Sequence, residues 1–139
     1  MSSNYISATM RRLVYERANF CGEYCLIPEA FTFATHEIDH IIAKKHGGKT
    51  IAENLALSCT LCNKYKGSDL TSIDPETDAI TPLYHPRIDK WSENFKIQNG
   101  RVIPLTSKAR VTTRLLQLNR KERIEERKLM IEVGIIKLS

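Results

Sequence analysis

Four cysteines arranged in two close pairs are the strongest constraint on how this chain folds. Three residues separate Cys21 from Cys25, two separate Cys59 from Cys62, and 33 residues lie between the pairs. Two such pairs can surround one tetrahedral Zn²⁺ ion with four thiolates and tie distant segments together. We therefore expect a structural zinc site, since four protein ligands leave no position open for catalysis. Buried free thiols are the alternative.

The composition is that of an ordinary globular protein. The chain has 139 residues, of which 42% are hydrophobic and 27% charged, so we expect one domain spanning residues 1–139. The N-terminal residues lack a signal-peptide pattern, and no apolar stretch is long enough to cross a bilayer. We expect a cytoplasmic protein with no membrane contact. In that reducing compartment, structural disulfides are not expected.

The excess positive charge lies near the C-terminus. Residues 1–100 contain 11 Lys and Arg against 12 Asp and Glu, whereas residues 101–139 contain 10 against 4. A basic segment attracts a polyanion, because each neutralised phosphate releases counterions. Nucleic acid is therefore a candidate partner. The alternative is a set of helices whose Lys and Arg side chains only face solvent.

Apolar periodicity in the first half of the chain predicts two helices with a strand between them. Ser7 is a suitable cap for a helix over 8–18. The aromatic and branched residues of 31–43 favour a strand, and 44–49, with its two glycines, favours a loop. A second helix is expected from Cys59 to Gly67.

The second half of the chain predicts a hairpin followed by two helices. Residues 68–86 contain several turn-prone positions and are expected to wrap the surface. A hairpin is expected next, formed by residues 95–98 and 101–105 around Asn99-Gly100. Thr106 is expected to cap a helix over 106–118. A last helix is expected to begin with a capping box of Asn119 and Glu122 and to end near Gly134. The fold class expected for the whole chain is α+β.

Asp39 and His40 are the side chains best suited to chemistry. A carboxylate beside an imidazole at a strand end can bind a divalent cation while the ring reaches a water molecule. Asn63, near the start of the second predicted helix, can add a neutral oxygen ligand. Such a small ligand set suits Mg²⁺, which retains several waters and substrate oxygens.

These residues also carry a family resemblance. The stretch from Cys21 to Gly67 resembles the HNH endonucleases, or ββα-metal nucleases: it has Cys…Cys, Asp-His, Gly-Gly, Asn-Leu and Cys-x-x-Cys-Asn-x-x-Lys-Gly in that order. More loosely, the preceding helix and the segment from Ser68 onward resemble small stand-alone bacterial members with a four-cysteine zinc site. The resemblance implies a ββα-metal core at 21–67 with an N-terminal helix and a C-terminal extension at 68–139.

The resemblance also assigns roles to individual residues. It implies that His40 is the general base and that Asp39 and Asn63 bind a catalytic Mg²⁺ or Mn²⁺. It also implies that Asn54 helps to position His40 by hydrogen bonding in the loop, and that Lys66 contacts a substrate phosphate. Cys21, Cys25, Cys59 and Cys62 would hold Zn²⁺, although Gly22 stands where relatives commonly have the first thiol. We expect His36 to lie at the surface or to support the site and His46 to face solvent, and we expect neither of them nor His85 to be catalytic.

The implied activity is metal-dependent hydrolysis of DNA, most readily double-stranded, that leaves 5′-phosphate and 3′-hydroxyl ends. Because no base-reading element is evident, we expect contacts mainly to phosphates. A protein partner or a homodimer is compatible with this assignment. Two alternatives stay open at this point: a non-catalytic, zinc-stabilised nucleic-acid-binding module, and an RNase that uses the same site.

Overall fold

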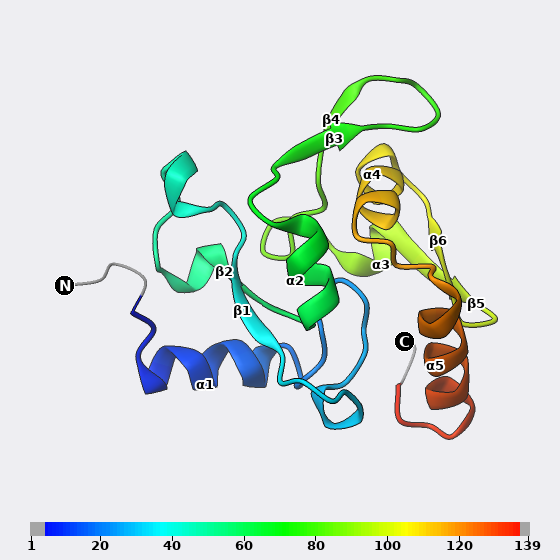
Figure 1. Cartoon of the computed structure of the whole chain (residues 1–139), viewed down its shortest axis with the longest axis horizontal. Coiled ribbons are helices and arrows are strands. Elements are labelled where there is room, and N and C mark those ends of the chain that lie inside the picture. The colour runs from blue at the N-terminus through cyan, green and yellow to red at the C-terminus, as the bar shows by residue number, and fades with distance from the viewer. Residues whose placement is uncertain (1–4, 137–139) are drawn as a thin grey trace. The chain divides into compact units, whose positions relative to one another are not determined.

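The computed structural model describes residues 5–136, and the chain divides into two compact units. The first unit ends at Ser68 and the second begins at Asp69, and each is described by itself below (Figure 1). Whether the two act as the single domain expected from the sequence stays a prediction. Within residues 5–136, no helix combines the length and apolar character needed to span a membrane. The mixture of helices and small antiparallel sheets confirms the α+β class.

The first unit begins with helix α1, Ala8–Arg17. The hydroxyl of Ser7 accepts a hydrogen bond from the backbone N–H of Met10, as expected for an N-cap. Val14 is fully buried and packs with Leu55 and Leu57 in the core of this unit. The helix predicted over 8–18 is therefore confirmed to within one residue.

Strands β1 (Glu37–His40) and β2 (Leu55–Ser58) form a two-stranded antiparallel sheet in which Asp39 pairs with Ala56 and His40 with Leu55. The prediction of a strand over 31–43 is wrong outside β1. The short 3₁₀ helix η1 (Glu29–Phe31) and an irregular segment precede it. The Glu29 carboxylate accepts the backbone N–H of His36 at 2.7 Å, and this local bond replaces a sheet partner.

The loop between β1 and β2 depends on two glycines. It contains the 3₁₀ helices η2 (Lys44–His46) and η3 (Ala52–Asn54). Gly47 adopts a left-handed conformation with φ of 92°. A Cβ atom on Gly48 would lie 1.7 Å from the carbonyl oxygen of Ile42, so only glycine fits at that close approach. The predicted loop at this position is confirmed.

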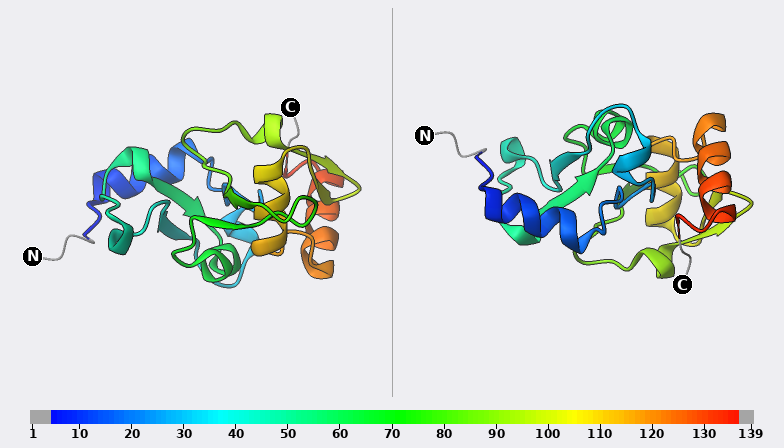
Figure 2. Two further views of the ribbon diagram at one scale, coloured as in Figure 1. Left: turned by 90° about the horizontal axis from the view of Figure 1, so that it is seen from above. Right: turned by 90° about the horizontal axis from the view of Figure 1, so that it is seen from below.

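Helix α2 (Thr60–Lys66) completes a ββα unit with β1 and β2. The Cys59 sulfur accepts the backbone N–H of Cys62, and Gly67 ends the helix with a positive φ. Side chains alternate along a strand. Ile38 and Leu57 therefore lie on the face covered by α1, whereas Asp39 lies on the face that contacts α2. Figure 2 gives two further views of this arrangement.

The second unit begins with a hairpin that the sequence analysis missed. Strands β3 (Thr71–Ile73) and β4 (Ile80–Pro82) pair antiparallel within the segment expected to wrap the surface. Asp74 directly follows β3, and both of its carboxylate oxygens accept hydrogen bonds from Arg110 at 3.0 and 2.8 Å. Its oxygens also accept from the backbone N–H of Glu76 and the hydroxyl of Thr77. This bonding fixes the tight connection between the strands.

The predicted second hairpin is confirmed. Strands β5 (Phe95–Gln98) and β6 (Arg101–Pro104) pair around Asn99-Gly100, after the short helix α3 (Trp91–Asn94). The Phe95 ring contacts the rings of Tyr84 and Trp91, with centroids 5.2 and 5.0 Å apart. These aromatic contacts fix the hairpin within the second unit.

Helices α4 (Ser107–Leu115) and α5 (Lys121–Glu132) follow, and the Thr106 cap on α4 is confirmed. The predicted capping box is wrong: Asn119 instead bonds the backbone N–H and carbonyl of Val102 with its side chain. Arg127 is fully buried and donates to the carbonyls of Gly100 and Leu118. Part of the basic character of the tail therefore serves folding.

Candidate active site

A surface hollow of about 470 Å³ brings together the three side chains predicted to carry the chemistry. Its lining residues are Ile6, Ile38, Asp39, His40, Ala43, Lys44, Asn63 and Gly67. Asp39 and His40 come from the end of β1, and Asn63 comes from α2. Neighbouring residues within a strand point to opposite faces. Asp39 and His40 can nevertheless line the same hollow, because the hollow lies where β1 ends.

The His40 ring is held by a residue that the sequence analysis missed. Its Nε2 lies 2.9 Å from Thr50 Oγ1 in the loop before η3. Partial burial lowers the pKa of His40, the Asp39 carboxylate opposes this shift, and Lys44 and Lys66 reinforce it. The ring is therefore neutral near pH 7, the form required of a base. No sequence signal marks Thr50, because its role depends on the path of the loop.

Asp39 is a buried carboxylate with two partners. Its oxygens lie 3.1 and 3.3 Å from Lys66 Nζ, and Tyr24 donates its hydroxyl at 3.3 Å. Burial raises the pKa of Asp39, and both partners oppose that shift. Only 2% of Lys66 is exposed, and its ammonium also donates to the carbonyls of His40 and Ile41. The expectation that Lys66 meets a substrate phosphate is therefore corrected: it stabilises the end of β1 from inside.

Asn63 is oriented by Glu37, a residue to which the sequence analysis gave no role. The Asn63 side-chain Nδ2 donates to a Glu37 carboxylate oxygen at 2.8 Å. Since the amide nitrogen is engaged, Oδ1 is the atom that can face a cation. Glu37 lies two residues before Asp39 on the same face of β1. Strand alternation was thus the signal that could have identified it.

Asn54 forms its hydrogen bonds within the loop, as the resemblance implied. Its side chain accepts the backbone N–H of Ile42 and donates to the carbonyls of Ile42 and Lys49, each at 2.9 Å. The structure describes no bond between the Asn54 and His40 side chains. Asn54 is therefore a positioning residue that closes the loop carrying Thr50.

The remaining histidines are not among the residues that line this hollow. His36 is buried and its Nε2 lies 2.8 Å from the carbonyl oxygen of Ile27, which corrects the expectation of a surface residue or one supporting the site. His46 is exposed, as expected. His85 belongs to the second unit, where its Nδ1 accepts the backbone N–H of Arg87.

Three of the four cysteines form a candidate metal centre. The sulfurs of Cys25, Cys59 and Cys62 lie within 4.8 Å of one another, and all three residues are buried. Hydrogen bonding among the thiols, followed by burial, raises the pKa of Cys25 to about 12 and also raises the pKa of Cys62. A bound cation would remove the thiol protons. Three converging sulfurs from two separate turns match the donor set of zinc.

Cys21 stands outside this group. Its thiol lies 3.4 Å from the carbonyl oxygen of Asn19. An ideal Cβ on Gly22 would instead lie 2.9 Å from the Cys25 sulfur and 3.8 Å from Cys59 Cβ. Position 22 therefore borders the cluster, and the extra residue in the first cysteine pair turns Cys21 away. A four-thiolate site that includes Cys21 stays a prediction.

An antiparallel pair and a helix form a small ββα unit, and it carries a thiol cluster that could hold a metal ion. Residues 21–69 match the family model described as HNH endonuclease, so this part of the chain is an HNH domain. The family consists of nucleases that use divalent metals. No curated protein and no solved structure gives a significant match to the chain.

Proposed function

We propose that the chain is a divalent-metal-dependent DNA endonuclease whose active site is the hollow at the end of β1. The observation that carries this proposal is that Asp39, His40 and Asn63 line one surface hollow inside the segment that matches the HNH family. These three residues supply one carboxylate, one imidazole and one amide. That set combines ligands for a hard cation with a base for a water molecule.

His40 is the general base in this proposal. In this proposal the imidazole carries its proton on Nε2, which lies 2.9 Å from Thr50 Oγ1, and the lone pair of Nδ1 takes a proton from water. The ring's lowered pKa keeps it unprotonated at neutral pH. The protonated ring formed during the reaction then lies beside the Asp39 carboxylate. A positioned base of this kind contributes roughly 10²- to 10⁴-fold to the rate.

Asp39 and Asn63 would hold the divalent cation. The donor set fits Mg²⁺ or Mn²⁺, because it offers one charged and one neutral oxygen and leaves other positions to water and phosphate. When bound, the ion neutralises charge on the phosphate and on the leaving oxygen. Glu37 keeps the Asn63 amide oriented through its hydrogen bond at 2.8 Å.

Substrate phosphates would meet Lys44 at this hollow. Lys44 lines the hollow, whereas the buried Lys66 does not.

Zinc would hold the turn at Cys25 against the N-terminus of α2 through Cys25, Cys59 and Cys62. Its role is structural, because these thiols are buried and do not line the hollow.

Cleavage of supercoiled plasmid tests the proposed function. The wild-type protein should nick the plasmid with Mg²⁺ or Mn²⁺ and should stop when EDTA is added. His40→Ala should lose about 10²-fold or more of the rate, whereas His46→Ala, which changes an exposed histidine of the adjacent loop, should keep it. Binding without cleavage by the zinc-loaded wild type would instead identify a non-catalytic nucleic-acid-binding module. A single-stranded RNA substrate, digested in parallel, distinguishes an RNase.

A further inference from the structure

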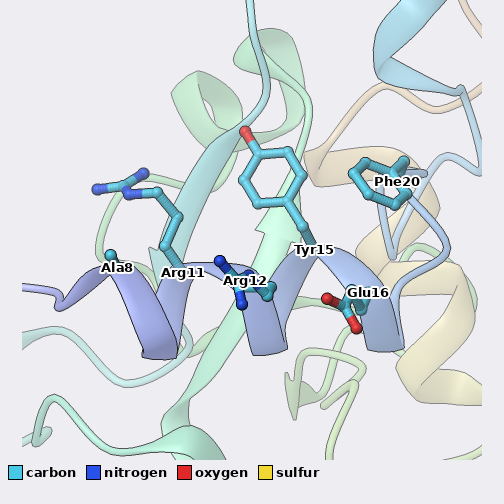
Figure 3. Close-up of a pocket in the computed structure, with 6 residues that line it drawn as sticks. All are labelled: Ala8, Arg11, Arg12, Tyr15, Glu16 and Phe20. Carbon is cyan, nitrogen blue, oxygen red and sulfur yellow. The ribbon is translucent and has the colours of Figure 1, made fainter.

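Helix α1 carries a second hollow that the proposed reaction does not use. It measures about 450 Å³ and is shown in Figure 3. Its lining residues are Ala8, Arg11, Arg12, Tyr15, Glu16 and Phe20. Every one of them belongs to α1 or to the turn that follows it, so this hollow is preformed by one well-capped helix.

Two arginines of this hollow are free to bind an anion. Arg11 and Arg12 are both exposed, and within residues 5–136 the guanidinium group of neither has a hydrogen-bond or ion-pair partner. Arg17 of the same helix differs, because its guanidinium donates to the carbonyls of Ala52 and Leu55. Glu16 is the one acidic residue in the lining. Two unpaired guanidinium groups match the charge and geometry of phosphates.

An exposed aromatic ring lines the same hollow at its other end, beyond Tyr15 and Glu16 (Figure 3). Phe20 is 52% exposed and has a φ of 60°, which is uncommon for a residue with a side chain. Its ring packs against Tyr15, with centroids 5.7 Å apart. The remaining face of the ring suits a nucleobase, because any base can stack on an aromatic side chain.

Tyr15 makes this edge of the hollow rigid. Its hydroxyl donates to a Glu29 carboxylate oxygen at 2.7 Å and lies 3.1 Å from the carbonyl oxygen of His36. Burial and the Glu29 bond raise the pKa of Tyr15 to about 12, so the hydroxyl stays a donor at working pH. A stacking platform held in this way loses little side-chain entropy when it binds.

The hollow is adjacent to the candidate active site. Ile6 lines the hollow that contains His40, and Ala8, two residues later, lines the hollow on α1. The carbonyl that Tyr15 contacts belongs to His36, directly before β1. Figure 3 shows the β1 ribbon behind α1. The 10 residues of α1 extend about 15 Å, a length that covers about four nucleotides of a strand.

We propose that the hollow on α1 binds the DNA strand beside the scissile linkage, with phosphates on Arg11 and Arg12 and an unpaired base on Phe20. The inference rests on the proposed function for its link to cleavage, and it names the substrate class: DNA with unpaired nucleotides next to the cleavage position. A base inside a duplex cannot stack on Phe20, so single-stranded or locally opened DNA is favoured.

Binding to labelled DNA by the zinc-loaded, non-cleaving His40→Ala protein tests this inference. Fluorescence anisotropy is measured with Ca²⁺ for a short single strand and for the same sequence as a duplex. Arg11→Ala and Arg12→Ala should each weaken binding to the single strand. Each should also make the slope of the logarithm of the binding constant against the logarithm of the salt concentration shallower by roughly 0.7. Phe20→Ala should weaken single-strand binding roughly 5- to 150-fold, leave duplex binding little changed, and be rescued in Phe20→Tyr.

Two further variants exclude a general charge effect. Arg101→Ala removes the same charge from an exposed position of β6 and should change binding less than either α1 variant. Glu16→Gln should strengthen binding. Equal losses for Arg101→Ala, Arg11→Ala and Arg12→Ala, or unchanged binding in Phe20→Ala, would overturn the inference, and the hollow would then be better suited to a protein partner.

The inference and the proposed function can fail separately. If the wild type cleaves DNA while the α1 variants bind DNA as tightly as the His40→Ala protein does, only the inference is lost. If no cleavage occurs while single-strand binding still depends on Arg11, Arg12 and Phe20, the binding hollow stands and the enzymatic proposal is lost.

Discussion

The ammonium group of Lys66 lies 3.1 Å from a carboxylate oxygen of Asp39, and both side chains are buried. The pair joins α2 to the end of β1, which is the position where the candidate active site forms. Lys66 also donates to the backbone carbonyls of the two residues after Asp39. This pair therefore determines where the backbone of His40 lies.

Removing one partner of this pair should be strongly destabilising. Lys66→Met leaves the Asp39 carboxylate buried without its cation, and we expect a loss of about 3–5 kcal/mol in the free energy of unfolding. Urea denaturation measures this loss. Lys64→Met, at an exposed position of the same helix, should change stability little. The double variant Lys66→Met/Asp39→Asn should recover part of the loss, and failure to recover any of it would contradict a direct coupling.

Asn54→Ala should loosen the loop between β1 and β2. Three hydrogen bonds to the backbone of Ile42 and Lys49 are removed. At about 0.5–1.5 kcal/mol each, the expected loss is roughly 2 to 4 kcal/mol. The rate of amide hydrogen exchange should rise at the backbone N–H of Ile42, because this group donates its hydrogen bond to the Asn54 side chain. Exchange that stays as slow there as in the wild type would show that the loop does not depend on Asn54.

The cysteines should differ in their effect on zinc content. Cys25→Ser, Cys59→Ser and Cys62→Ser each remove a sulfur from the cluster, and each should purify with little zinc and reduced stability. Cys21→Ser should retain its zinc, because that thiol faces the Asn19 carbonyl. Metal analysis and the charge-transfer bands of the Co²⁺-substituted protein measure both effects. Loss of zinc in Cys21→Ser would show that the turn rearranges to supply a fourth thiolate.

The stability of the second unit should depend on pH through Asp74. Hydrogen bonds from Arg110 hold the pKa of Asp74 well below its ordinary value of 3.8, and the bond from the Glu76 N–H adds to this. A carboxyl group whose pKa is depressed by folding contributes stability above its unfolded pKa, and that contribution is lost as pH falls through the folded pKa.

Chemical denaturation followed between neutral and strongly acidic pH tests the role of Asp74. The wild type should lose stability as acid protonates Asp74. Arg110→Gln should be less stable at pH 7 and should show a smaller decrease in acid. Parallel pH profiles for the two proteins would rule out this ion pair as the source of the acid sensitivity.

Much of the first unit could be predicted because its signals are local. The Ser7 cap, the Gly47-Gly48 loop and the helix between Cys59 and Gly67 each follow from short stretches of sequence, and all three are confirmed. The hairpin around Asn99-Gly100 is confirmed for the same reason. The strand predicted over 31–43 is confirmed only over β1. Before β1, Glu29 bonds the backbone of His36, a contact between residues seven apart that no propensity indicates.

The candidate site could be predicted in its reactive groups but not in their support. Asp39, His40 and Asn63 came from the motif, and they line one hollow. Thr50 and Tyr24 reach His40 and Asp39 only through the tertiary fold. Lys66 was placed at the substrate because the family resemblance implied a contact with a phosphate there. Its buried position depends on the carboxylate across from it.

Chemical rescue of a His40→Gly variant tests the central claim most directly. The single-turnover rate of DNA cleavage is measured with Mn²⁺, in zinc-loaded protein, with and without added imidazole. We predict that His40→Gly is at least about 10²-fold slower than the wild type and that imidazole restores part of the rate, because it supplies the missing base in the cavity. A His40→Gly protein that cleaves as fast as the wild type without imidazole would contradict the account.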